Sequence, residues 1–184
     1  MRSYIQLDVG HAVDGGYSLR VEYGKNWRFL DVGLSLGAIN TIPLRNESFG
    51  ATSRIKTFYP YSAWTFFYAE SGSWQGSMST LLMLHVRLDI INLFWNESNH
   101  SARIGVGYGM AHIQRTYKIW RPEVVESGHI RHHLANDIRV WTAWNFSLEY
   151  AFAINERVSL SAFYNGVLGP EHDVLGIGIR RYFR

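Results

Sequence analysis

Apolar residues recur at every second position along most of this chain. Residues 4–10 read YIQLDVG, in which isoleucine, leucine and valine alternate with glutamine and aspartate. Successive side chains of a β-strand point to opposite faces of its sheet, so strict alternation predicts a strand with one apolar face. We find no segment with a helical period, and we predict an all-β fold. The alternation recurs in eight stretches, at residues 4–10, 17–23, 30–37, 80–91, 103–110, 144–152, 158–165 and 173–183.

Length and composition narrow the class of protein. A chain of 184 residues is expected to form one domain, here residues 1–184. No apolar run approaches the roughly 20 residues of a membrane helix. The net charge is only +3, without a block of like charges, so we expect no nucleic-acid partner. No signal peptide is visible ahead of the first alternating segment, so the chain is either cytoplasmic or has had a signal removed.

The connections between the predicted strands fall into two length classes. Those after the second, fourth and sixth strands are short to moderate, whereas residues 40–76 and 115–137 form long interruptions. A membrane β-barrel has short periplasmic turns and longer extracellular loops. An even number of strands would also leave both termini at the short-turn end. This pattern predicts an eight-stranded antiparallel up-and-down barrel with extracellular loops at about 40–76 and 115–137.

The two faces of these strands differ sharply in chemistry. One face is almost entirely apolar. The other carries five acids, four arginines and a histidine, together with glycines such as Gly33, Gly105 and Gly107. An eight-stranded barrel is just wide enough inside for side chains, and enclosed charges are tolerable when they are paired. We therefore predict a filled polar interior and an apolar exterior in lipid; the alternative is a soluble barrel with its apolar face inside. The predicted interior network comprises Asp8, Arg20, Glu22, Asp31, His85, Arg87, Asp89, Arg103, Glu149 and Arg180.

Aromatic residues gather near the predicted strand ends. Such residues form girdles at the two membrane interfaces of transmembrane barrels. Their positions therefore favour the membrane alternative. Trp27, Phe29, Phe94 and Trp95 lie by the short turns, and Trp120, Trp141 and Trp144 lie near the long loops.

The end of the chain carries a family resemblance. Residues 176–183 read GIGIRRYF, and residues 17–23, 28–34 and 102–109 have a similar alternating pattern. The chain resembles the small eight-stranded outer-membrane β-barrels of Gram-negative bacteria, with the size and pattern of OmpX, OmpW and PagL, and most closely the generic barrels of Bacteroidetes. The resemblance implies a bacterial outer-membrane location with the signal peptide removed and surroundings of lipid and lipopolysaccharide. It also implies insertion by the barrel assembly machinery, with Tyr182 and Phe183 as the assembly signal, although Arg184 follows where the family pattern ends on the aromatic.

Some of the small outer-membrane barrels that the chain resembles are enzymes. The lipid A deacylases of this size carry a His-x-Ser-Asn motif on their penultimate strand. Residues 161–165 read SAFYN and lack both the histidine and the serine of that motif. A hydrolytic nucleophile needs a base within hydrogen-bond reach, so we predict no catalytic residues. His129, His132 and His133 could bind a metal, but beyond Asp137 no carboxylate or cysteine lies at a matching spacing. We therefore expect a solvated loop there, and neither metal nor cofactor.

The aromatic segment in the first long loop is the candidate contact surface. Exposed aromatic residues above a barrel favour docking of a partner, glycan or lipopolysaccharide, whereas the alternative is a β-hairpin that only extends the wall. We predict a non-enzymatic structural or accessory subunit of a larger outer-membrane protein complex. The rivals are a lipid A-modifying enzyme and a soluble lipocalin-like ligand-binding barrel. The candidate docking residues are Phe58, Tyr59, Tyr61, Trp64, Phe66 and Tyr68.

Overall fold

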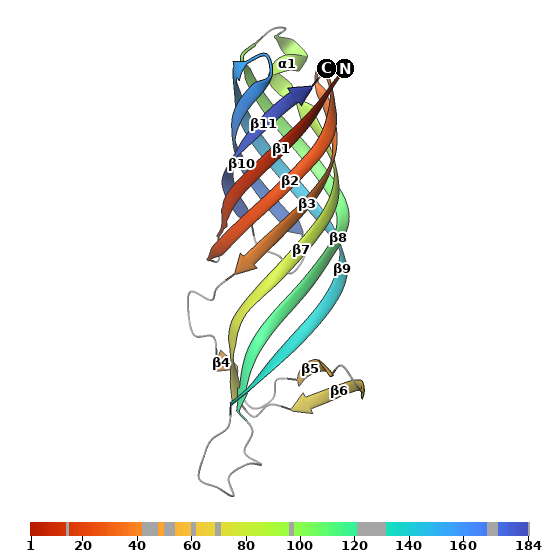
Figure 1. Cartoon of the computed structure of the whole chain (residues 1–184), viewed down its shortest axis with the longest axis vertical. Helices are drawn as coiled ribbons and strands as arrows, with labels where there is room; N and C mark the ends of the chain where they lie inside the picture. Colours follow the sequence, from red (N-terminus) through yellow and green to blue (C-terminus); the bar gives the residue numbers. More distant parts are fainter. Residues whose placement is uncertain are drawn as a thin grey trace, which may run out of the picture.

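A computed structural model describes residues 1–13, 15–41, 48–49, 54–59, 62–68, 71–95, 98–120, 132–168 and 173–183. Eight strands form the barrel wall (Figure 1). The described residues also include one short helix and three strands outside the wall. The wall strands are β1 (Arg2–Ala12), β2 (Gly16–Trp27), β3 (Leu30–Thr41), β7 (Ser71–Asp89), β8 (His100–Trp120), β9 (His132–Asn155), β10 (Val158–Leu168) and β11 (Val174–Phe183). The remaining elements are β4 (Ser48–Phe49), β5 (Arg54–Tyr59), β6 (Ser62–Tyr68) and α1 (Ile90–Phe94).

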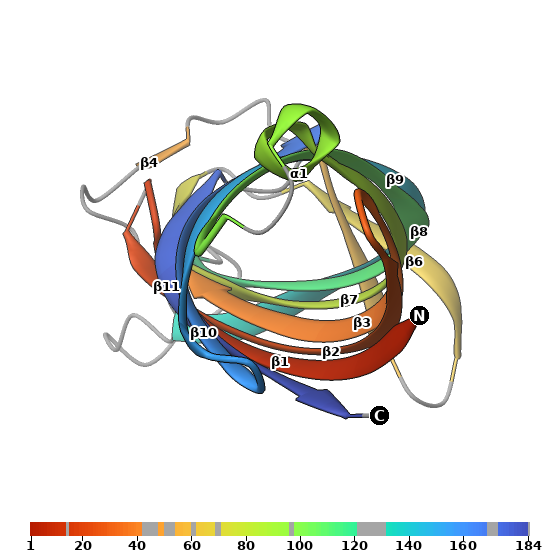
Figure 2. The same cartoon turned by 90° about the horizontal axis from the view of Figure 1, so that it is seen from above.

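The wall is a closed antiparallel barrel. Each wall strand pairs with the next one along the chain, β3 pairs with β7 across the first long connection, and β1 pairs with β11 to close the ring. Figure 2 shows the ring viewed along its axis. The predicted fold class, an eight-stranded up-and-down barrel, is therefore confirmed. Among the described residues, no helix is long and apolar enough to cross a membrane.

The connections at one end of the barrel are compact, and both termini lie there (Figure 1). Arg28 turns the chain between β2 and β3 with a positive φ of 44°. The connection from β7 to β8 contains α1, whose first turn is capped by Asp89, because its Oδ1 accepts a 3.2 Å hydrogen bond from the Asn92 backbone. The sequence predicted a strand as far as residue 91, and this cap explains why the strand ends at Asp89 instead.

Three neighbouring strands are much longer than the others. β7, β8 and β9 have 19, 21 and 24 residues, whereas the other wall strands have 10 to 12. They continue past the barrel at the end opposite the termini (Figure 1). We call residues 71–76, 116–120 and 132–136 the arm. The predicted loops 40–76 and 115–137 were therefore wrong at 71–76, 115–120 and 132–137, where the strands keep their ladder pairing.

The barrel is apolar outside and polar inside. The outward side chains of β7 and β11 are exposed, with Leu84 at 52% and Ile177 at 66%, whereas the inward Arg87 and Arg180 are at most 1% exposed. A soluble barrel with an apolar interior would show the reverse distribution, so that alternative is wrong. Glycine makes room for the inward side chains: a Cβ on Gly105 would collide with the Arg87 side chain and lie 2.8 Å from the Ser147 hydroxyl.

Candidate functional site

A bidentate ion pair anchors the polar interior on the β2 and β7 side. Arg87 on β7 donates to both carboxylate oxygens of Glu22 on β2, at 2.6 and 2.5 Å. The Tyr4 hydroxyl donates to the same carboxylate at 2.6 Å. All three side chains are buried. Because the two guanidinium donors match the two carboxylate oxygens, this pair fixes the distance between strands that are not neighbours in the wall.

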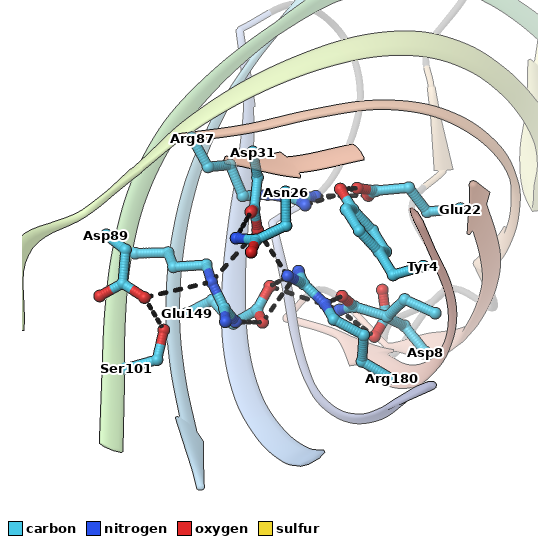
Figure 3. Close-up of polar contacts among 12 residues, drawn as sticks. Tyr4, Asp8, Glu22, Asn26, Asp31, Arg87, Asp89, Ser101, Glu149 and Arg180 are labelled. Carbon is cyan, nitrogen blue, oxygen red and sulfur yellow. Dashed lines mark hydrogen bonds and ion pairs between the residues drawn. The ribbon is translucent and has the colours of Figure 1, made fainter. Parts of the chain in front are cut away.

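A second group of charges surrounds Arg180 on β11 (Figure 3). Its guanidinium lies 2.5 Å from Asp31 on β3 and 3.3 Å from Glu149 on β9. It also lies 4.2 Å from the centroid of the Tyr4 ring, which connects this group to the Glu22 pair. Arg103 on β8 shares the same two carboxylates, at 2.6 Å from Glu149 and 3.2 Å from Asp31. These contacts join five of the wall strands across the lumen.

The remaining charges attach at the margins of this network. Asp8 lies 2.6 Å from Arg20 and accepts a 2.8 Å hydrogen bond from Gln6. Gln6 in turn accepts from Arg180 at 2.6 Å, so the Asp8 pair is continuous with the rest. Asp89 lies 3.8 Å from Arg103 and also accepts a hydrogen bond from Ser101. The structure thus brings nine of the predicted interior residues into one connected network, in which Arg20 is the most exposed at 12%.

His85 lies outside the ion-pair network, whereas Tyr4 and Gln6 belong to it. His85 forms no ion pair within the described part of the chain; its Nε2 lies 2.6 Å from the Ser35 hydroxyl, and its Nδ1 has no partner there. Tyr4 and Gln6 connect the ion pairs, yet the predicted network omitted them. The signal was available, because both share the parity of Asp8 on β1 and so point to the same face.

On the side of the charge network that faces the arm, a layer of apolar side chains fills the lumen. A cavity of about 40 Å³ lies at the boundary, lined by residues that include His85, Asn145 and Phe163. That volume suits a few water molecules. The charged residues of the lumen therefore lie in the half near the termini, whereas the arm side holds the apolar layer and uncharged buried residues such as Thr41 and Ser77, a division that the sequence analysis did not predict. The apolar layer consists of Ala12, Ile39, Leu81, Met83, Ala111, Ile113, Ala143, Phe163 and Val174.

The Ser35–His85 contact is the arrangement nearest to a nucleophile and base. A hydroxyl within 2.6 Å of an imidazole has the required reach. However, no group among the described residues orients the imidazole through Nδ1, both residues are at most 2% exposed, and the adjacent cavity is small. Among the side chains that the structure describes, no group of three His, Cys, Asp or Glu residues could hold a metal ion. His129 lies outside the described residues, as do the side chains of His132 and His133 on β9.

The aromatic candidates lie on a hairpin outside the barrel wall. Among the described strands, β5 and β6 pair with each other and with no other strand, in a separate two-stranded sheet whose register places Lys56 opposite Phe66. Phe58 and Tyr59 belong to β5, and Trp64, Phe66 and Tyr68 belong to β6; their side chains and Tyr61 lie outside the described residues. The hairpin lies beside the arm in Figure 1. The segment therefore forms a β-hairpin, as one of the two alternatives expected, but this hairpin adds no strand to the wall, and docking through it stays a prediction.

The two residues of the predicted assembly signal point to opposite faces of β11. Tyr182 points inward, where its hydroxyl accepts a 3.2 Å hydrogen bond from Arg103. Its ring makes an edge contact with Tyr4, at 6.3 Å between centroids. Phe183 points outward and is 38% exposed. Tyr182 therefore belongs to the interior network as well, whereas Arg184 lies outside the described residues.

Comparison with solved structures identifies the architecture. Neisserial surface protein A aligns over 99% of this chain and 95% of its own, with a TM-score of 0.53 and 11% identity. The chain folds as a small outer-membrane β-barrel. Also found are Ail, the attachment invasion locus protein of Yersinia pestis (9% identity, 99% and 96% coverage, TM-score 0.49), and the N-terminal β-barrel domain of Pseudomonas aeruginosa OprF (14%, 99% and 97%, 0.48). No protein-family model matches the sequence, and no curated protein is significantly similar to it.

Proposed function

We propose that this chain is a non-enzymatic barrel of the bacterial outer membrane that acts as an accessory subunit, presenting the arm and the β5–β6 hairpin to a partner protein. The main support for this function is the length of β7, β8 and β9. A tilted strand crosses the hydrocarbon core with about 9–11 residues. β9 has 24 residues, so roughly half of it lies outside the core. The barrel itself needs no such extension in order to close.

The outer surface changes character where the arm approaches. Along β8, the outward residues Tyr108 and Met110 are followed by His112 and Gln114. A lipid-facing row stays apolar through the bilayer and becomes polar at the interface. On β9, the outward Ile138 and Val140, paired with Gln114 and His112, are still apolar and exposed. The bilayer boundary therefore lies near this level, and the sheet of the arm beyond it is in water, where its strands offer side-chain groups to another protein.

The β5–β6 hairpin supports the same function. A two-stranded hairpin alone is marginally stable in water, and aromatic residues are enriched at protein interfaces. Five of the six candidate aromatics fall on the paired strands of this hairpin. A partner that packs against them would supply the burial that two strands lack. The filled lumen suits a supporting role, since in the described part of the barrel it is occupied by buried side chains.

Affinity purification from native membranes in mild detergent tests the proposal. We expect the wild-type chain to retain a stoichiometric companion and a Trp64→Ser/Phe66→Ser variant to lose it. A matched variant, Tyr17→Ser, removes an exposed aromatic at the same end of the barrel outside the hairpin, and should keep the companion. A photo-crosslinker at position 64 should label that same companion. Retention by the hairpin variant, or no companion with any variant, contradicts the accessory role.

The mass spectrum of lipid A from cells that overexpress the chain distinguishes a lipid A-modifying enzyme from an accessory subunit. We expect an unchanged mass spectrum with the wild-type chain, because the Ser35–His85 pair is enclosed and has no orienting acid. A mass shift that disappears in Ser35→Ala would establish an enzyme in place of an accessory subunit.

A further inference from the structure

Three arginines surround an open pocket at the rim that holds the termini. The pocket has a volume of about 300 Å³ and lies where β1, β10 and β11 meet. Its lining contains three guanidinium groups, one carboxylate, a tyrosine and a phenylalanine, which leaves an excess of two positive charges. The lining residues are Arg2, Glu156, Arg157, Arg181, Tyr182 and Phe183.

We propose that this rim pocket binds the phosphodiester group of an anionic phospholipid in the adjacent membrane leaflet. The proposal requires only that the barrel lies in a membrane, so it is independent of the accessory role above. The ligand class follows from the chemistry of the lining, because a guanidinium presents several donors in a planar fork that matches phosphate oxygens.

The outward row of β11 places the pocket at headgroup depth. Leu175, Ile177 and Ile179 point outward with exposures of 55, 66 and 46%, and the next residue on that face is Arg181. Its neighbours in the ladder are Ile5 on β1 and Val158 on β10. The cation therefore lies near the end of three adjacent lipid-facing rows, with Phe183 beyond it on β11. A long basic side chain at this depth keeps its stem against hydrocarbon and its charge among the headgroups.

Backbone contacts fix the strands and the turn from which these side chains extend. The Asn155 side-chain oxygen accepts 2.9 Å hydrogen bonds from the backbone N–H groups of Arg157 and Val158, which holds the β9–β10 turn. The Arg157 carbonyl accepts a 2.7 Å hydrogen bond from Tyr182 and so ties the turn to β11. Arg2 donates to the Glu156 carbonyl at 3.2 Å, which draws β1 to the same turn.

The guanidinium groups remain available to a ligand. Within the described part of the chain, neither Arg157 nor Arg181 forms an ion pair. Arg181 contacts the Phe183 ring instead, 5.5 Å from its centroid, an arrangement that leaves its N–H donors unused. The lining thus combines the outward Arg181 and Phe183 with the inward Tyr182, so the pocket lies at the rim beside the lipid-facing row of β11, a setting for a headgroup attached to acyl chains more than for a soluble anion. Short turns mark the periplasmic end of such barrels, so the leaflet is the inner one.

The test is native mass spectrometry of the full chain in mild detergent, titrated with dioleoyl-phosphatidylglycerol or dioleoyl-phosphatidylcholine. We expect wild type to retain the anionic lipid preferentially. Arg157→Gln/Arg181→Gln should lower its apparent affinity by about tenfold or more, given the contribution of each cation near an anionic surface. The matched control Lys25→Gln/Arg28→Gln removes two charges at the same end of the barrel but outside the pocket, and should retain wild-type affinity.

Three results would overturn the proposal. They are equal retention of the two lipids, equal loss of affinity in the two double variants, and full displacement of the anionic lipid by inorganic phosphate, which would indicate a soluble-anion site. Both double variants are first checked for the heat-dependent gel mobility of a folded barrel. Should the double variant fail to fold, Arg157→Gln alone takes its place, since Arg157 is an exposed turn residue.

Discussion

At the scale of single residues, the Glu22–Arg87 pair shows how this barrel encloses charge. Both side chains are at most 1% exposed, and their carboxylate and guanidinium meet in a bidentate contact. Tyr4 adds a third hydrogen bond to Glu22, at 2.6 Å. Removal of one partner of such a pair leaves the other charge buried without compensation, which is far more destabilising than removal of both.

We therefore expect Arg87→Met to lower the free energy of unfolding by about 3–5 kcal/mol. The double variant Glu22→Gln/Arg87→Met should lose less than the sum of the two single variants, because neither charge remains. Guanidinium-induced unfolding in lipid vesicles, followed by tryptophan fluorescence, measures these differences. Lys25→Met, which removes an exposed cation on β2, should change stability by less than about 0.5 kcal/mol. Additive losses in the double variant would show that the two side chains are not coupled.

At the scale of one element, β7 passes from lipid into water along a single outward row. Leu84 and Met78 belong to that row and have similar exposures, 52 and 56%. They differ in depth: Leu84 is paired with Leu34 and Tyr108 in the barrel wall, whereas Met78 is paired with Asn40 and Gln114 near the arm. Exposure alone thus does not distinguish the two positions, but the surrounding solvent does.

Arginine substitution along β7 should reveal the membrane boundary. We expect Leu84→Arg to destabilise the barrel by about 2–4 kcal/mol and Met78→Arg by about 0–1 kcal/mol, following the depth dependence of lipid-facing charges. Unfolding free energies in vesicles measure both. Equal effects at the two positions would mean that the boundary does not lie between them.

At the scale of the whole molecule, the lumen is closed in two ways. A network of paired charges occupies the end near the termini, and an apolar layer follows toward the arm. An eight-stranded barrel has an interior that side chains can fill completely. This construction gives a rigid support for the arm and is unsuited to conduction.

Reconstitution into planar bilayers should consequently give no stepwise conductance. A sixteen-stranded porin in the same bilayers provides the positive control, since barrels of that size enclose an aqueous channel. Reproducible single-channel steps from the purified chain would show that the lumen opens, and they would contradict a purely supporting role.

Local pattern was enough to predict the barrel wall. Alternation along residues 4–10 and 144–152 identifies strands because side-chain direction has a period of two, and the unequal loops indicate which ends of the strands lie together. The inward direction of Asp8, Glu149 and Arg180 also follows from parity. What parity does not provide is partner identity: that Arg180 meets Asp31, from a strand far away in the chain, depends on ring closure.

By itself, the sequence determined the period, the strand number and the inverted faces, since each depends on residues close together in the chain. Only the tertiary structure decided which charges pair, where the apolar layer crosses the lumen, and how far β7, β8 and β9 continue. The strands of the arm mix polar residues with aromatic residues such as Trp74 and Trp120, and their ladder exists because neighbouring strands supply the hydrogen bonds. Likewise, Arg2, Arg157 and Arg181 come together at the rim only because β1, β10 and β11 close the barrel there.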